Sequence, residues 1–142
     1  MDDPHNLGRF LRAQANSYET VISELGRGRK RSHWMWYIFP QYVGLGISPA
    51  SQCYAIKSMT EVDAYVSHPV LGPRLIECFD AVMRIERRWA REIFGAPDDL
   101  KLKSSATLFA HASAPDSIFQ RVLEKYFEGE RDGRTLSLIG AN

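Results

Sequence analysis

The sequence predicts an all-α protein, a compact single-domain bundle of about seven to nine helices. In most segments apolar residues recur at spacings of three and four, which is the periodicity of an amphipathic helix. Proline beside a serine or an acidic residue recurs along the chain and marks helix starts. No run alternates apolar and polar residues over a convincing strand length. The length of 142 residues suits one domain with a sizeable core, so residues 1–142 are predicted to form a single helical domain.

The first helical pattern covers residues 4–25, where apolar residues recur every three or four positions. Asn16 and Ser17 could divide it into two helices, with Asn16 as a cap. The glycines of the segment 26–28 are expected to end it, because glycine adopts the left-handed conformation common after a helix. Ser32 is the expected N-cap of a short aromatic helix that ends before Pro40, since a residue that precedes proline avoids helical geometry.

Three more helix starts follow in the middle of the chain. Ser48 and Pro49 predict a helix to about residue 57, because proline fits the first helical turn. The segment 60–63, Thr-Glu-Val-Asp, resembles a capping box with aspartate in place of the usual glutamate. A proline at 69 or 73 is expected to open the longest helix, whose last turn carries the cations of the segment 84–88.

The C-terminal part is expected to contain further helices. A short helical turn is predicted at 90–94, closed by Gly95. Segments 97–99 and 115–116, Pro-Asp-Asp and Pro-Asp, place acidic residues where the positive end of a helix dipole favours them. Residues 135–139 are expected to form a final short element.

Composition excludes several classes of protein. The formal net charge is +1, with 44% hydrophobic and 25% charged residues, so a dedicated polyanion-binding coat is not expected. No apolar run approaches the roughly 20 residues of a membrane span, and no secretory signal is visible. Cys53 and Cys78 have no CxxC spacing, which predicts reduced thiols in a cytoplasmic protein. No metal site or cofactor is expected, because the histidines are scattered and no phosphate-binding glycine motif is present.

The most unusual stretch is the segment 29–41, in which three cations run into a histidine, two tryptophans and a tyrosine. On a helix starting near Ser32, Trp34 and Trp36 point about 200° apart, so one ring is expected in the core while the other can stack on a ligand. His33 could act as a general acid or base; a structural histidine is the alternative. The cations could hold phosphate or could be a solvated loop. The ligand-binding residues predicted here are Lys30, Arg31, Ser32, Trp34, Trp36, Tyr37 and Gln41.

A second candidate stretch follows Pro97. Asp98, Lys101 and Ser105 are spaced three and four apart and share one helix face, while Leu102, Ala106 and Phe109 form an apolar stripe that can seat the helix in the core. This face predicts the wall of a polar cleft, with helix capping and a solvated lysine face as the alternative. The candidate catalytic residues are Asp98 and Lys101 with His33, and Lys103, Ser105 and Thr107 are further candidate ligand contacts.

Three stretches, residues 28–41, 68–75 and 93–109, resemble one family: family 1810 of the domains of unknown function, small bacterial proteins sometimes labelled calpastatin. The resemblance runs from Asp3 to about Leu138. It implies a multihelical single domain and no established activity. A fainter likeness links the chain to helical domains that handle ADP-ribose-linked metabolites.

Two functions follow as expectations, and the sequence does not decide whether the protein is an enzyme. The first is a site for a small anionic ligand, a nucleotide or an ADP-ribose-like molecule, in a cleft between the 29–41 and 98–107 segments. The alternative is a non-catalytic module that docks a protein or nucleic-acid partner through the basic-aromatic stretch. Neither the oligomeric state nor the pathway can be inferred.

Overall fold

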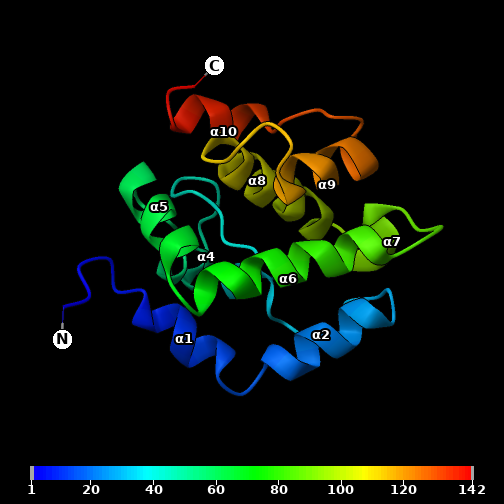
Figure 1. Ribbon diagram of the computed structural model, residues 1–142, viewed down its shortest axis with the longest axis horizontal. Coiled ribbons are helices and arrows are strands. Elements are labelled where there is room, and N and C mark those ends of the chain that lie inside the picture. Colours follow the sequence, from blue (N-terminus) through cyan, green and yellow to red (C-terminus); the bar gives the residue numbers. More distant parts are fainter. Residues whose placement is uncertain (1, 142) are drawn as a thin grey trace.

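The computed structural model describes residues 2–141 and confirms the all-α class (Figure 1). Over these residues the only β-type pairing is an isolated parallel bridge between Tyr42 and Ile56. The helices within the described range are α1 Gly8–Gln14, α2 Tyr18–Gly26, α3 Met35–Ile38, α4 Pro49–Cys53, α5 Met59–Ser67, α6 Leu71–Arg84, α7 Ala90–Phe94, α8 Asp98–His111, α9 Ile118–Phe127 and α10 Gly133–Leu138. They number ten rather than seven to nine, because the pattern at 4–25 forms two helices and the 135–139 element is helical. No helix of the described part is long and apolar enough to cross a membrane.

Helix α6 runs through the middle of the molecule, with α1 and α2 on one side and α8, α9 and α10 on the other (Figure 1). Helix α8 is the most enclosed element, because every residue from Ser104 to Ala110 is buried. Most of these side chains are small, which lets neighbouring helices pack closely around it. Two of its hydroxyls bond within the helix: Ser104 donates to the Leu100 carbonyl at 3.1 Å and Thr107 to the Lys103 carbonyl at 2.8 Å. The predicted stripe of Leu102, Ala106 and Phe109 is confirmed as core.

A continuous line of aromatic rings connects the two sides of α6. Phe39 of the 29–41 segment lies 4.9 Å from Phe79 of α6, which in turn lies 4.9 Å from Phe119 of α9, both in edge-to-face geometry. Trp34 extends the line at one end, and Phe109 of α8 extends it at the other. Aromatic pairs in this arrangement add stabilisation beyond the area they bury. The basic-aromatic stretch is therefore anchored in the core through its rings.

Several predicted helix boundaries were wrong by a few residues. Ser58, rather than Thr60, caps α5, accepting the Glu61 N–H at 3.1 Å. Ser117 caps α9 in place of the expected Pro-Asp opening. Helix α6 ends at Arg84, so the cations that follow lie in a loop rather than in its last turn. The predicted start at Ser48 and Pro49 is confirmed, with the Ser48 hydroxyl accepting the Ser51 N–H.

Arg9 fixes the N-terminal helix to the segment that precedes α5. Its guanidinium forms an ion pair of 2.7 Å with Glu61 and donates to the carbonyls of Cys53 and Ala55 at 2.8 Å each. The Ile56 N–H then donates to the Gln41 carbonyl at 2.9 Å. These bonds hold both ends of the 41–56 segment, which contains α4. Its first part, residues 41–51, forms one wall of the site described below.

Phe79→Ala should destabilise the fold by about 3–5 kcal/mol, because it removes the central ring of the aromatic line and leaves a cavity. Ile76→Ala on the same helix is the matched control, since Ile76 is 47% exposed and should cost less than about 1 kcal/mol. Chemical denaturation of both variants measures the difference. Equal losses would contradict the placement of Phe79 at the centre of the core.

Candidate functional site

The start of the basic-aromatic stretch is organised by one buried carboxylate, that of Glu24 in α2. Its Oε1 accepts the backbone N–H groups of Arg31 at 2.7 Å and Ser32 at 2.9 Å, and the indole N–H of Trp34 at 2.9 Å. Its Oε2 accepts the Ser32 hydroxyl at 2.5 Å. Four donors therefore converge on one side chain, which fixes the backbone direction of residues 31–34.

Burial alone would raise the pKa of Glu24. The hydrogen bonds from the Ser32 hydroxyl, from the backbone of Arg31 and Ser32, and from Trp34 outweigh it and lower the pKa to about 2. These donors favour the ionised carboxylate. Glu24 is thus a permanent structural anion at neutral pH.

This arrangement corrects the prediction that Ser32 caps the aromatic helix. The Ser32 hydroxyl donates to Glu24 instead, and α3 begins only at Met35, after Trp34. The backbone before Met35 is not helical, so His33 and Tyr37 do not lie one turn apart on a helix.

The two tryptophans differ in burial, and one of them is in the core as predicted. Trp34 is 1% exposed and packs 6.1 Å from Phe39, so it is a core residue and its assignment as a ligand contact is corrected. Trp36 is half-buried, and the Lys101 ammonium lies 4.9 Å from its ring centroid. Its indole N–H is buried without a hydrogen-bond partner among the described residues. Each ring therefore lies beside one predicted lysine, Trp36 beside Lys101 and Trp34 beside Lys30.

The 29–41 and 98–107 segments meet at Asp98, the first residue of α8. One Asp98 oxygen lies 3.0 Å from the ammonium of Lys30, and the other lies 3.1 Å from that of Lys101. The Lys30 side chain is 9% exposed and also lies over the Trp34 ring at 5.3 Å. Its backbone N–H donates to the Ile93 carbonyl at 2.7 Å. The sequence places Lys30 and Asp98 far apart, and the fold brings them into contact.

Next to this cluster is a hollow of about 330 Å³. Its walls come from the 41–51 segment, which includes the start of α4, from the first two turns of α8, and from the start of α10. Two cations, Lys101 and Arg134, line it. The remaining lining residues are Gln41, Leu45, Gly46, Ser51, Pro97, Leu100, Ser104 and Asp132. Gln41 and Lys101 were both predicted as site residues, one from each segment.

Two other predicted ligand contacts, Ser105 and Thr107, are buried inside the bundle. Thr107 accepts the Asp132 N–H at 2.8 Å, which helps to hold the start of α10 against α8. Lys103 forms an ion pair with Glu130. None of the three residues lines the hollow, so the structure gives no support to the prediction that they touch a ligand there.

The remaining predicted residues lie outside the lining of the hollow. Tyr37 donates to the Ser17 hydroxyl at 3.0 Å, and its carbonyl accepts the Gln14 amide at 2.9 Å, so it faces α1. His33 and Arg31 are exposed. Since no lining residue comes from the 30–37 segment, a catalytic role for His33 at this hollow has no geometric support.

Sequence reasoning missed Arg134 and Asp132. Asp132 caps α10: one of its oxygens accepts the N–H of Thr135 at 3.0 Å and its hydroxyl at 2.6 Å. The same oxygen accepts the Ser104 hydroxyl at 3.3 Å. The charged turn between Gly129 and Gly133 was the available signal, but its proximity to α8 could not be read from spacing.

Comparison with known proteins gives one family and one solved structure. The family model described as a protein of unknown function, DUF1810, matches residues 4–139, which confirms the resemblance seen in the sequence. A crystal structure of the conserved hypothetical protein Rv1873 from Mycobacterium tuberculosis is 50% identical, with a TM-score of 0.95. The match covers 99% of this chain and 100% of that one. No curated protein matches the chain.

Glu24→Gln should destabilise the protein by roughly 2–4 kcal/mol near neutral pH, because the lowered pKa measures how strongly the native state favours the anion. The wild-type contribution is complete above the ordinary value of 4.5 and is lost as the pH falls toward about 2. Unfolding free energies measured across this range should therefore fall less steeply in the variant.

Glu19→Gln is the matched control, because Glu19 is an exposed glutamate on the same helix and makes none of these hydrogen bonds. It should keep the wild-type pH dependence. A Glu24→Gln profile parallel to that of the wild type would contradict the assignment of Glu24 as the anion that fixes residues 31–34.

Proposed function

The chain belongs to the DUF1810 family of proteins of unknown function, and we propose that it binds a small anionic ligand, a nucleotide or an ADP-ribose-like molecule. The proposed site is the hollow between the 41–51 segment, α8 and α10. The observation that carries the proposal is the convergence of Lys101 and Arg134, two cations from distant parts of the chain, on one concave surface with Gln41.

Charge is the first support. Lys30 and Lys101 share the single carboxylate of Asp98, so this cluster keeps one net positive charge at the edge of the hollow. Arg134 is exposed, and its guanidinium makes only a long contact of 3.4 Å with the Gly44 carbonyl. It can therefore turn toward a phosphate or carboxylate and form two parallel hydrogen bonds with it.

The lining is the second support. The volume of about 330 Å³ is at the small end of the range of about 300–1,000 Å³ usual for ligand sites. Gln41 and Ser51 supply hydrogen-bonding groups suited to sugar hydroxyls. Leu45 and Leu100 supply apolar area for a flat ring. A specific ligand site combines a few placed polar groups with apolar walls in this way.

Gly46 lets the loop backbone approach the opposite wall closely. A side chain at this position would place its first carbon 2.5 Å from the Ser51 side chain, closer than atoms approach without displacement. Any larger residue would therefore push Ser51 out of the lining.

If the ligand is also processed, Lys101 is the candidate catalytic residue that lines the hollow, and Asp98 can act through its 3.1 Å ion pair with Lys101. His33 lacks this placement. The alternative function, a macromolecular partner docked on the basic-aromatic stretch, has support only from the exposed cations Arg29 and Arg31. The rings Trp34 and Phe39 are buried and cannot contribute to such a surface.

Thermal-shift and calorimetric titrations with AMP, ADP, ADP-ribose and inorganic phosphate test the proposal. At least one of these probes should raise the melting temperature of the wild type. Lys101→Gln and Arg134→Gln should each weaken that probe's affinity roughly 10- to 100-fold, because each removes a charge-assisted contact. Lys30 still pairs with Asp98 in the Lys101 variant, so the fold should be retained.

Arg121→Gln is the matched control, an exposed arginine on α9 away from the hollow, and it should bind as the wild type does. His33→Ala should also retain binding. The absence of a shift with all four probes, or binding that survives both site substitutions, would refute this function. Tight binding of long polyanions that falls steeply with salt would favour the docking alternative.

A further inference from the structure

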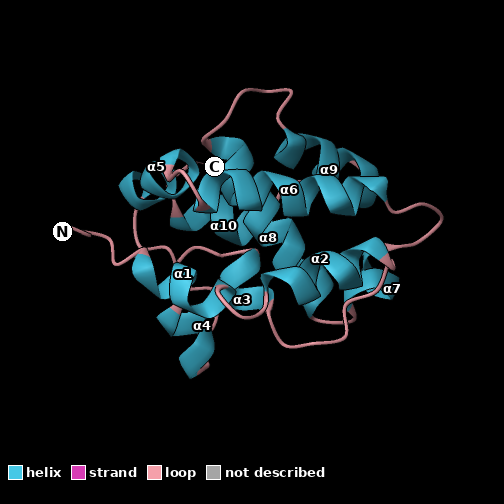
Figure 2. Cartoon of the chain, turned by 60° about the horizontal axis from the view of Figure 1, so that its bottom comes forward, coloured by secondary structure: helices cyan, strands magenta, loops and turns pink. Residues whose placement is uncertain are grey.

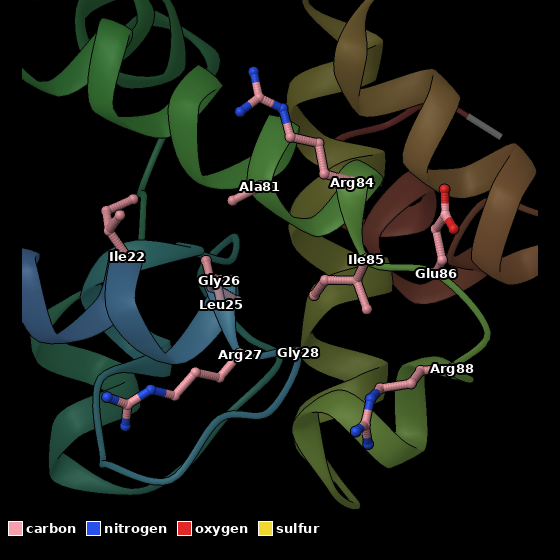
Figure 3. Close-up of a pocket in the computed structure, with 10 residues that line it drawn as sticks. All are labelled: Ile22, Leu25, Gly26, Arg27, Gly28, Ala81, Arg84, Ile85, Glu86 and Arg88. Carbon is pink, nitrogen blue, oxygen red and sulfur yellow. The ribbon is translucent and has the colours of Figure 1, made fainter.

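A groove on the other side of α6 shares no lining residue with the hollow described above. It consists of two adjoining hollows between α2 and α6, of about 540 and 630 Å³. Both are lined by Ile22, Ala81 and Arg84, so they form one continuous depression. Figure 3 shows the first hollow, with Ile22 on one side and Ala81 and Ile85 on the other.

The base of this groove is aliphatic. Ile22 and Leu25 come from α2, whereas Ile76 and Ala81 come from α6, and Ile76 is 47% exposed. From Pro73 to Arg84 the groove follows about three turns of α6, or roughly 17 Å at 1.5 Å per residue. A helix of similar length could lay an apolar stripe along it.

Two arginines without ion-pair partners in the described part of the chain lie at one end of the groove. Arg27 and Arg88 line the mouth next to Gly28, and neither forms an ion pair within the described residues. Figure 3 shows their guanidinium groups extending outward from the two walls. At the other end Asp80 pairs with Arg84 at 2.7 Å, and Glu77 accepts the Tyr18 hydroxyl but keeps its negative charge. The excess of positive charge is therefore confined to the hollow next to Gly28, where Arg27 and Arg88 face Glu86 as the one carboxylate of the described lining.

An exposed tryptophan extends this basic end. Trp89 is 77% exposed and follows Arg88 in the loop between α6 and α7, with exposed Arg87 and Arg91 nearby in sequence. A single exposed ring does not by itself mark an interface, but this one directly follows an arginine of the groove lining. Tryptophan and arginine are the residues most enriched among those that dominate protein–protein binding energy.

We propose that the α2–α6 groove docks a short amphipathic helix of a partner protein, with apolar residues against Ile22, Ile76 and Ile85 and carboxylates against Arg27 and Arg88. Charge complementarity selects an acidic segment, and the aliphatic base selects one with an apolar face. Single-stranded nucleic acid fits less well, because no aromatic ring lines the groove to stack on a base.

Fluorescence anisotropy with a labelled 14-residue helical peptide tests the proposal. The probe carries leucine at spacings of three and four and glutamate elsewhere; its counterpart carries lysine in place of glutamate. The acidic peptide should bind with micromolar affinity and the lysine peptide at least 10-fold more weakly. Ile76→Glu and Arg88→Glu should each weaken the acidic peptide at least 10-fold. Both positions are on the surface, so the fold should be retained, as circular dichroism can verify.

Ile47→Glu is the matched control, because Ile47 is 92% exposed and lies outside the groove, and it should bind as the wild type does. Equal binding of the two peptides, or binding unaffected by Ile76→Glu, would overturn the proposal. Tighter binding of a thymidine 15-mer that depends on Arg88 would show that the groove binds single-stranded nucleic acid rather than a peptide. A dimer seen by analytical ultracentrifugation and abolished by Ile76→Glu would show that the occupant of the groove is a second copy of the chain.

Discussion

The arrangement of the candidate site depends on one pair of contacts, in which Lys30 and Lys101 share the carboxylate of Asp98. Asp98 opens α8 and lies against both ammonium groups at about 3 Å. An ammonium as enclosed as that of Lys30 is costly without a partner, so the loop that carries it is held against the start of α8. Because one carboxylate serves two lysines, the cluster retains positive charge beside the hollow. The same three side chains therefore supply both the structural pairing and the net positive charge on which the proposed ligand site relies.

Glu24 supplies the second constraint, by dividing the basic-aromatic stretch into a buried and an exposed part. Its carboxylate gathers the backbone of Arg31 and Ser32 and the indole of Trp34, which turns the ring into the core. The cations Arg29 and Arg31 remain at the surface, while Trp36 is left half-buried beside Lys101. The line of rings through Phe39 and Phe79 then anchors the stretch to α6. The helical core thus positions the candidate site through the segment between α2 and α3.

Much of the fold could be predicted from the sequence, because helical periodicity and capping chemistry act over a few residues. The apolar stripe of α8 and the proline start of α4 follow from local geometry. The contacts that complete the site depend on residues far apart in the chain. Glu24 resembles one more solvated carboxylate on an amphipathic helix, and Arg134 lies 33 positions beyond Lys101. Ser32 was misjudged because a tertiary acceptor, Glu24, competes with the local capping bond.

The most direct test is a double-mutant cycle on Lys30 and Asp98, with unfolding free energies measured for the wild type, Lys30→Met, Asp98→Asn and the double variant. If the pair joins the two segments, the two losses should be coupled by about 1–3 kcal/mol, with the double variant less destabilised than the sum of the single variants. Additive losses, with coupling below about 0.3 kcal/mol, would contradict the account, because the loop and α8 would then be held together by other contacts.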